Sequence, residues 1–114
     1  MTFGQIASFL REWRRLRLTD EDLQALETLI MERPEAGQVM QGTGGLRKIR
    51  FAPPSWRTGK SGATRVCYVY FVSAAWCELL MIFSKNQKPN LSAAEKARAR
   101  QYIADLRRQL EKGR

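Results

Sequence analysis

The segment RVCYVYFV, residues 65–72, is followed closely by WCELLMIF, residues 76–83. Both are rich in the β-branched and aromatic residues that favour strands. The whole apolar run, residues 66–83, is about long enough to suggest a membrane-spanning helix, but it contains Ser73 and Glu78. Two adjacent strands joined near residues 73–75 explain the run better. We therefore predict a β-hairpin here and no membrane segment.

A further strand is predicted upstream, over residues 46–51, where polar and apolar side chains alternate. Because successive side chains of a strand point to opposite faces, Ile49 and Phe51 are expected on one face and Lys48 and Arg50 on the other. The glycine-rich stretch before this strand precedes no helix, so it is not a dinucleotide-binding fingerprint.

Helices are predicted on both sides of these strands. Residues 9–18 fit a first helix, and Thr19 is a good N-cap for a second helix, which ends before Pro34. Ser92 and Glu95 form the capping box that opens a last helix.

Helices first, strands in the middle and a helix at the end indicate an α+β fold with an antiparallel sheet. A short additional strand is expected over residues 2–6. The length of 114 residues is that of one domain, so we treat residues 1–114 as a single domain.

The charge balance points to a polyanionic partner. Twenty Lys and Arg residues against eleven Asp and Glu residues give a net charge of +9, and histidine is absent. A field of this strength favours nucleic acid, an anionic membrane surface or an acidic protein. The lack of histidine excludes Ser-His-Asp and Cys-His catalysis and removes the commonest transition-metal ligand.

Cysteine usage and the first residues of the chain indicate a cytoplasmic protein. Cys67 and Cys77 lie inside apolar runs and are expected to be buried free thiols. Two thiolates without histidine argue against a zinc site, so neither a metal nor a cofactor is expected. Residues 1–10 do not have the pattern of a signal peptide.

The middle of the chain carries a block of cations without a carboxylate. Between Glu35 and Glu78 lie only basic charged residues, namely Arg47, Lys48, Arg50, Arg57, Lys60 and Arg65. If the strands pair, Lys48, Arg50 and Arg65 share one sheet face, and Lys85 and Lys88 follow the last strand toward the same place. Such a block favours phosphate binding, although a Lys/Arg-rich sheet face can also be a solvated face that protects an edge. Trp56, in the basic loop, is a candidate for stacking on a base.

Three segments resemble a known family. GTGGLRKIR, residues 42–50, is similar to the central strand of RelE/ParE-superfamily toxins, especially the HigB-type branch. GKSG at residues 59–62 with RVCYVY at residues 65–70 resembles that family's glycine-rich turn and following strand. FSKNQKPNLS, residues 83–92, resembles the segment that leads into its last helix. In this order and spacing, the resemblance covers about residues 18–110.

The resemblance implies a RelE-like fold with two N-terminal helices, an antiparallel-dominated sheet of about four strands and a C-terminal helix. It implies the toxin of a type II toxin–antitoxin pair, a metal-independent endoribonuclease that cleaves mRNA on the ribosome. Its partner would be an antitoxin, usually of the helix-turn-helix type, and operator DNA would be contacted only through that antitoxin.

The resemblance also suggests roles for individual residues. Arg65 would hold the scissile phosphate, Lys48 and Arg50 would flank the attacking 2′-oxygen, and Lys85 or Lys88 would face the leaving group. Further RNA contacts would come from Lys60, Arg47, Arg57 and Trp56. Neighbouring positive charges lower a lysine pKa from about 10.4, which makes a lysine base feasible, but the division between base and acid stays open.

One departure from the family concerns aromatic chemistry. Some relatives carry a tyrosine near the start of the last helix, whereas this chain has Asn90, Leu91 and Ser92 there and Tyr102 well inside the helix. Because a fold does not determine an activity, two alternatives to the nuclease are kept: a ParE-like gyrase poison and a non-catalytic nucleic-acid-binding module.

Overall fold

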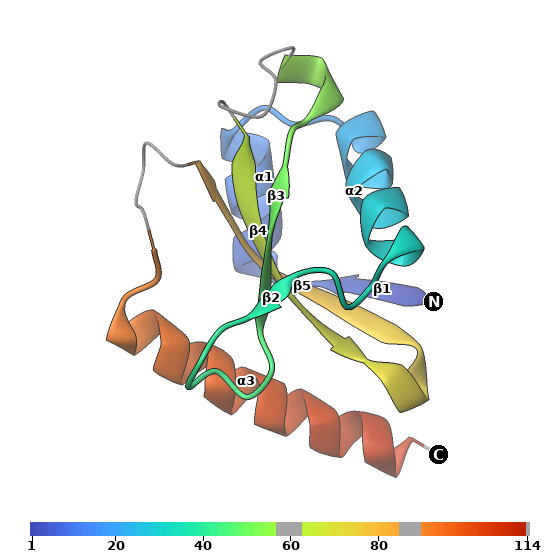
Figure 1. Cartoon of the computed structure of the whole chain (residues 1–114), viewed down its shortest axis with the longest axis vertical. Coiled ribbons are helices and arrows are strands. Elements are labelled where there is room, and N and C mark those ends of the chain that lie inside the picture. The colour runs from blue at the N-terminus through green and yellow to red at the C-terminus, as the bar shows by residue number, and fades with distance from the viewer. Residues whose placement is uncertain (57–62, 85–89, 114) are drawn as a thin grey trace.

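The structure is a computed structural model that describes residues 1–56, 63–84 and 90–113. In this part of the chain, three α-helices accompany a five-stranded sheet of order β1-β5-β4-β3-β2 (Figure 1). The strands are β1 (Thr2–Gln5), β2 (Gln38–Val39), β3 (Arg47–Phe51), β4 (Thr64–Phe71) and β5 (Trp76–Ser84). The helices are α1 (Ala7–Arg15), α2 (Asp20–Glu32) and α3 (Ala93–Lys112), with one-turn 3-10 helices η1 (Pro54–Trp56) and η3 (Val72–Ala74).

The sheet confirms the predicted α+β class. The hairpin of β4 and β5 forms its centre, and β2, β3, β4 and β5 pair antiparallel. The predicted N-terminal strand exists as β1, but it runs parallel to β5, so the sheet is mixed. Strand β2 was not predicted, because a two-residue strand has no period that a sequence can show.

The helix ends follow local chemistry. Thr19 caps α2 as predicted, and its side chain and that of Asp22 bond reciprocally to each other's backbone N–H. Ser92 and Glu95 do the same at the start of α3. Helix α1 begins earlier than predicted and ends earlier, because the chain turns out of the helix at Arg17, whose φ is 59°.

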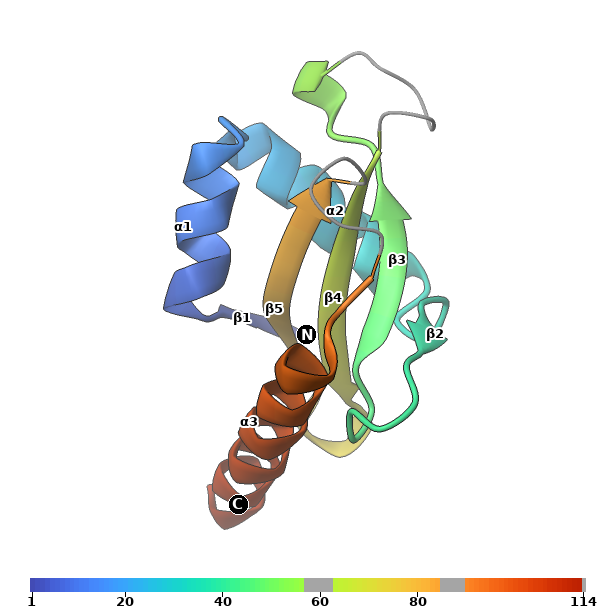
Figure 2. The same cartoon turned by 90° about the vertical axis from the view of Figure 1, so that its left-hand side faces the viewer.

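One face of the sheet is covered by α1 and α2. Its core stacks the ring of Trp13 between Phe9 and Phe51, with ring centroids 5.6 Å and 6.2 Å apart. Leu26 of α2 and Tyr68 of β4 are fully buried in the same cluster. Figure 2 shows α2 behind β3, β4 and β5.

The other face is crossed by α3 at one end only. Ala99 and Ile103 of α3 pack on Val69 and Phe71 of β4 and on Leu80 of β5. In Figure 2, α3 passes in front of the lower ends of these strands and continues beyond the sheet. The upper part of this face, which carries the ends of β3 and β5, is therefore not covered by α3.

A buried carboxylate attaches α3 to the sheet. Glu78 of β5 accepts hydrogen bonds from Tyr102 Oη at 2.6 Å and from Trp76 Nε1 at 2.8 Å. Gly4 of β1 makes room for it, because a Cβ there would lie 2.1 Å from Glu78 Oε1. Burial and the adjacent carboxylate raise the pKa of Tyr102, so its hydroxyl remains a donor to Glu78.

The predictions on cysteine and membrane segments can be compared with this structure. Cys67 and Cys77 are buried free thiols, as expected, and burial raises the pKa of Cys77 to about 12. Within the described ranges, no helix has both the length and the apolar character needed to cross a membrane.

Candidate nucleic-acid interface

Strand pairing brings three of the predicted site residues together. Arg50 of β3 lies directly opposite Arg65 of β4, and Lys48 lies opposite Cys67. Directly opposed residues of an antiparallel pair point to the same face. Cys67 belongs to the cluster on the α3 side, so Lys48, Arg50 and Arg65 lie on the α3 side of the sheet. Ile49 and Phe51 pack on the other side, as the alternation predicted.

Among the described residues, these three cations have no acidic partner. Arg50 is exposed, and Lys48 and Arg65 are half-buried. In the described part of the chain, no carboxylate lies within ion-pair distance of any of them. The hydrogen bond recorded for the Arg65 guanidinium is long, 3.5 Å from Nη1 to the carbonyl oxygen of Thr64.

The electrostatic consequence is an attractive site for an anion. Side chains directly opposite each other start from Cβ atoms about 5 Å apart, and like charges in such a pair are destabilising. A phosphodiester between Arg50 and Arg65 would replace this repulsion with two attractions. Guanidinium groups also match phosphate oxygens with two parallel N–H donors, which a single ammonium does not do.

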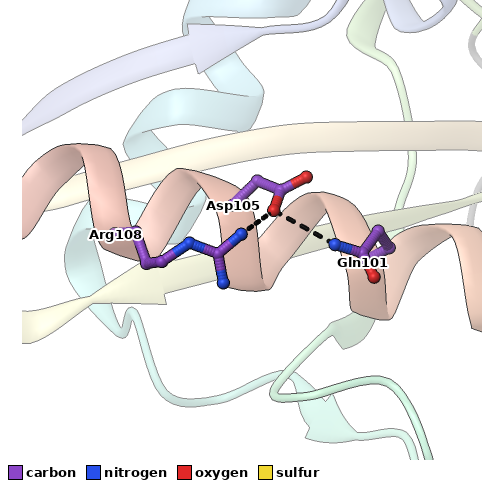
Figure 3. Close-up of polar contacts among 3 residues, drawn as sticks. All are labelled: Gln101, Asp105 and Arg108. Atoms are coloured by element: carbon purple, nitrogen blue, oxygen red, sulfur yellow. Dashed lines mark hydrogen bonds and ion pairs between the residues drawn. The ribbon is translucent and has the colours of Figure 1, made fainter.

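Two arginines on the helices, Arg15 and Arg108, are neutralised locally. On α3, Arg108 and Gln101 both donate to Oδ1 of Asp105, the latter over 3.1 Å (Figure 3). On α1, Arg15 forms an ion pair with Glu12. Unlike these two arginines, Arg50 and Arg65 have no carboxylate at ion-pair distance among the described residues.

Arg47 was predicted to contact RNA, but it does not join this face. It lies opposite Tyr68, on the side covered by α1 and α2. Its Nη1 donates to the carbonyl oxygens of Glu35 at 2.9 Å and Gly37 at 2.8 Å. A Cβ at Gly37 would lie 2.8 Å from the hydroxyl oxygen of Tyr68, so the segment that enters β2 is held tightly against β3.

Trp56 is also drawn toward the covered side. It is half-buried and packs against the core cluster of α1 and α2. The helix η1 that carries it is held by Asp22, whose carboxylate accepts from the backbone N–H of Ser55 at 3.0 Å and from the Ser55 hydroxyl at 2.5 Å. Stacking of Trp56 on a base stays a prediction.

Asp22 itself was missed as an anchor. In the sequence, Asp22 is one of three acidic residues in the first turn of α2, whereas in the structure this residue is 1% exposed and its carboxylate joins α2 to η1. Burial by itself raises the pKa of Asp22, but the hydrogen bonds from Ser55 and Thr19 outweigh it and leave the pKa below its usual value. Its burial and its contact with Ser55, 33 residues away, distinguish this residue from the exposed Asp20 and Glu21.

The remaining predicted residues, Arg57, Lys60, Lys85 and Lys88, lie outside the described residues. Among the described residues, no cluster of three or more Cys, Asp or Glu side chains is arranged to hold a metal ion. The described part of the site can therefore be characterised as a row of guanidinium and ammonium groups suited to bind a phosphodiester and to stabilise added negative charge on it.

No model of a known protein family matches the chain. Among solved structures, the chain is similar to the E. coli toxin RelE, in a double arginine-to-alanine mutant determined in the free state. The TM-score is 0.52 at 17% sequence identity, and the match covers 77% of this chain and 86% of the RelE chain. At this identity the comparison shows the fold: the protein has a RelE-like α+β fold.

Proposed function

We propose that this protein is the toxin of a type II toxin–antitoxin pair and cleaves mRNA on the ribosome. Two observations support the proposal: the RelE-like fold, and the direct opposition of Arg50 and Arg65, with no described carboxylate beside them, on the part of the sheet that α3 does not cover. The second observation carries it, because a fold by itself does not define an activity.

The proposed reaction is attack of a ribose 2′-oxygen on the adjacent phosphorus. The bond from phosphorus to the 5′-oxygen breaks, and the products are a 2′,3′-cyclic phosphate and a 5′-hydroxyl. The proton lost by the 2′-hydroxyl goes to a base, and an acid supplies a proton to the departing 5′-oxygen.

In this reaction, Arg65 and Arg50 hold the non-bridging phosphate oxygens and stabilise the charge of the pentavalent transition state. Lys48, two residues before Arg50 on the same face, flanks the 2′-oxygen. The resemblance assigns the leaving-group side to Lys85 or Lys88. The partner that restrains the activity is an antitoxin, of the helix-turn-helix type according to the same resemblance.

The test is induction of the chain alone in bacteria. Growth should stop, and primer extension should show cleavage inside translated messages with cyclic-phosphate ends. Arg65→Gln should restore growth and remove the cleavage, whereas the matched variant Arg108→Gln should remain toxic. Thermal unfolding of both purified variants checks that each is folded.

Three outcomes would count against the proposal. Normal growth with intact mRNA would overturn it, as would a folded Arg65→Gln protein that cleaves like the parent. An SOS response without mRNA cleavage would instead indicate gyrase poisoning.

A further inference from the structure

The sheet face that carries the cations continues into a hollow. Phe83 of β5 lies directly opposite Arg65, so Arg50, Arg65 and Phe83 form one row across β3, β4 and β5. Phe83 lines a hollow of about 660 Å³ between α1, β5 and the first half of α3. Neighbouring strands lie about 4.8 Å apart, so the hollow begins one strand away from Arg65.

The walls of the hollow combine an apolar floor with a polar rim. Leu80, Met81 and Phe83 of β5 and Ala99 of α3 contribute apolar surface. Around them stand Arg98 and Tyr102 of α3 with two carboxylates, Glu95 of α3 and Glu12 of α1. This volume and this mixture of a mainly apolar wall with a few polar groups are typical of sites for small organic ligands.

The carboxylates help to define the occupant. Glu12 pairs with Arg15 and Glu95 caps the backbone N–H of Ser92, so both are held at the rim as acceptors. As acceptors, they can receive hydrogen bonds from the N–H groups of a neutral ligand. A nucleobase is flat, apolar on its faces and rich in donors and acceptors at its edges, and protein sites read such bases by stacking and by edge hydrogen bonds.

We propose that this hollow binds the nucleobase of the nucleotide whose phosphate is held by Arg50 and Arg65. The inference rests on the proposed function, because it takes the ligand of the cationic row to be RNA. Met81 and Phe83 form the floor beneath the base, and Arg98 donates to its edge. The hollow would thus contribute to nucleotide preference, separately from cleavage.

Binding of ribonucleoside 5′-monophosphates tests the proposal. The probes are AMP, GMP, CMP and UMP, each compared with ribose 5-phosphate, which has the same phosphate and sugar but no base. Base stacking contributes about 1–3 kcal/mol, so at least one nucleotide should bind roughly tenfold more tightly than ribose 5-phosphate.

Methyl NMR locates the base. With labelled methionine methyl groups, the ring current of a bound base should shift the Met81 signal, whereas the exposed Met31 of α2 should not respond. Ribose 5-phosphate has no ring and should leave Met81 nearly unchanged.

Two arginines of α3 form a matched pair of variants. Both are exposed, but Arg98 lines the hollow, while Arg100 faces the segment around Gly44, on another side of the helix. Arg98→Ala should reduce the advantage of the nucleotide over ribose 5-phosphate about tenfold. Arg100→Ala should leave that ratio unchanged.

The outcomes separate this inference from the proposed function. Equal affinities for nucleotides and ribose 5-phosphate would overturn the proposed base site but not the phosphate site. The same holds if the Met81 methyl signal does not shift when a nucleotide binds. Failure of every probe to bind, including ribose 5-phosphate, would overturn both. If Arg98→Ala and Arg100→Ala lowered the affinity ratio of nucleotide to ribose 5-phosphate equally, the effect would come from the general positive charge and not from a contact with the base. That result would also overturn the inference.

Discussion

Neighbouring residues of β3 have different environments on the two faces of the sheet. On the face covered by α1 and α2, Phe51 is buried against Trp13, and Arg47 is tied to two backbone carbonyls. On the other face, Lys48 and Arg50 have no acidic partner within the described ranges, and α3 covers only part of the surface. One strand therefore contributes to stability on one side and offers a charged surface on the other.

The largest expected effect is on the free energy of unfolding, and it should differ sharply between the adjacent residues Arg50 and Phe51, which lie on opposite faces. Phe51→Ala should lower the free energy of unfolding by about 3–5 kcal/mol, because it leaves a cavity beside Trp13. Arg50→Ala should change it by less than about 0.5 kcal/mol. Urea denaturation of both variants measures this, and similar losses would contradict the division into a packed face and an open one.

Asp22, on the side of α1 and α2, should make the free energy of unfolding depend on pH. Its pKa is lowered in the folded state, so its contribution is present above the unfolded pKa of about 4 and is lost as the pH falls through the lower folded value. Asp22→Asn should cost about 1–3 kcal/mol near neutrality and reduce the loss on acidification. The exposed Asp20 supplies the control variant Asp20→Asn, measured by denaturation from pH 7 to pH 3. A profile identical for Asp22→Asn and wild type would refute the anchoring role.

The consecutive cations Arg47 and Lys48 lie on opposite faces of the sheet, so variants of the two residues compare the faces directly. Arg47→Met should destabilise the fold by about 1–2 kcal/mol, because two backbone carbonyls lose a charged donor. Lys48→Met should be neutral or slightly stabilising, since it reduces repulsion on the open face. For the binding of a single-stranded oligoribonucleotide, the order should be reversed: Lys48→Met should have the larger effect and Arg47→Met the smaller one. Lys48→Met should flatten the slope of log affinity against log salt by about 0.7. If Arg47→Met alone flattened the slope, the assignment of the faces would be wrong.

The smallest effect is expected on α3. Arg108→Ala removes an exposed ion pair with Asp105, and such pairs contribute less than about 1 kcal/mol. Neither the melting temperature nor the salt slope of RNA binding should change appreciably. A clear change in the salt slope would show that the cationic surface extends onto this helix.

Much of the fold could be predicted because its signals are local. The hairpin of residues 65–83 has a run of strand-forming side chains, and the caps at Thr19 and Ser92 depend on residues three positions apart. The alternation within β3 separated Ile49 and Phe51 from Lys48 and Arg50 correctly, because side-chain direction in a strand has a period of two.

What could not be predicted depends on pairing over long distances. The parallel placement of β1 beside β5, the contact of Asp22 with Ser55 and the row from Arg50 through Arg65 to Phe83 each join segments that are far apart in the chain. The register of β4 and β5 shifts between Cys67 and Tyr68, so even the position of Phe83 opposite Arg65 cannot be counted from the hairpin turn.

Composition and periodicity were sufficient for the class of the fold, the excess of positive charge and the exclusion of histidine chemistry, because each is a property of single residues or of neighbours in the chain. Which arginine is tied to the backbone, and which meets no carboxylate in the part of the chain that the structure describes, depends on where distant segments pack. Arg47 and Arg50 are three residues apart and chemically identical, but they lie on opposite faces of the sheet, and the carbonyl groups of Glu35 and Gly37, in the segment between α2 and β2, bind Arg47.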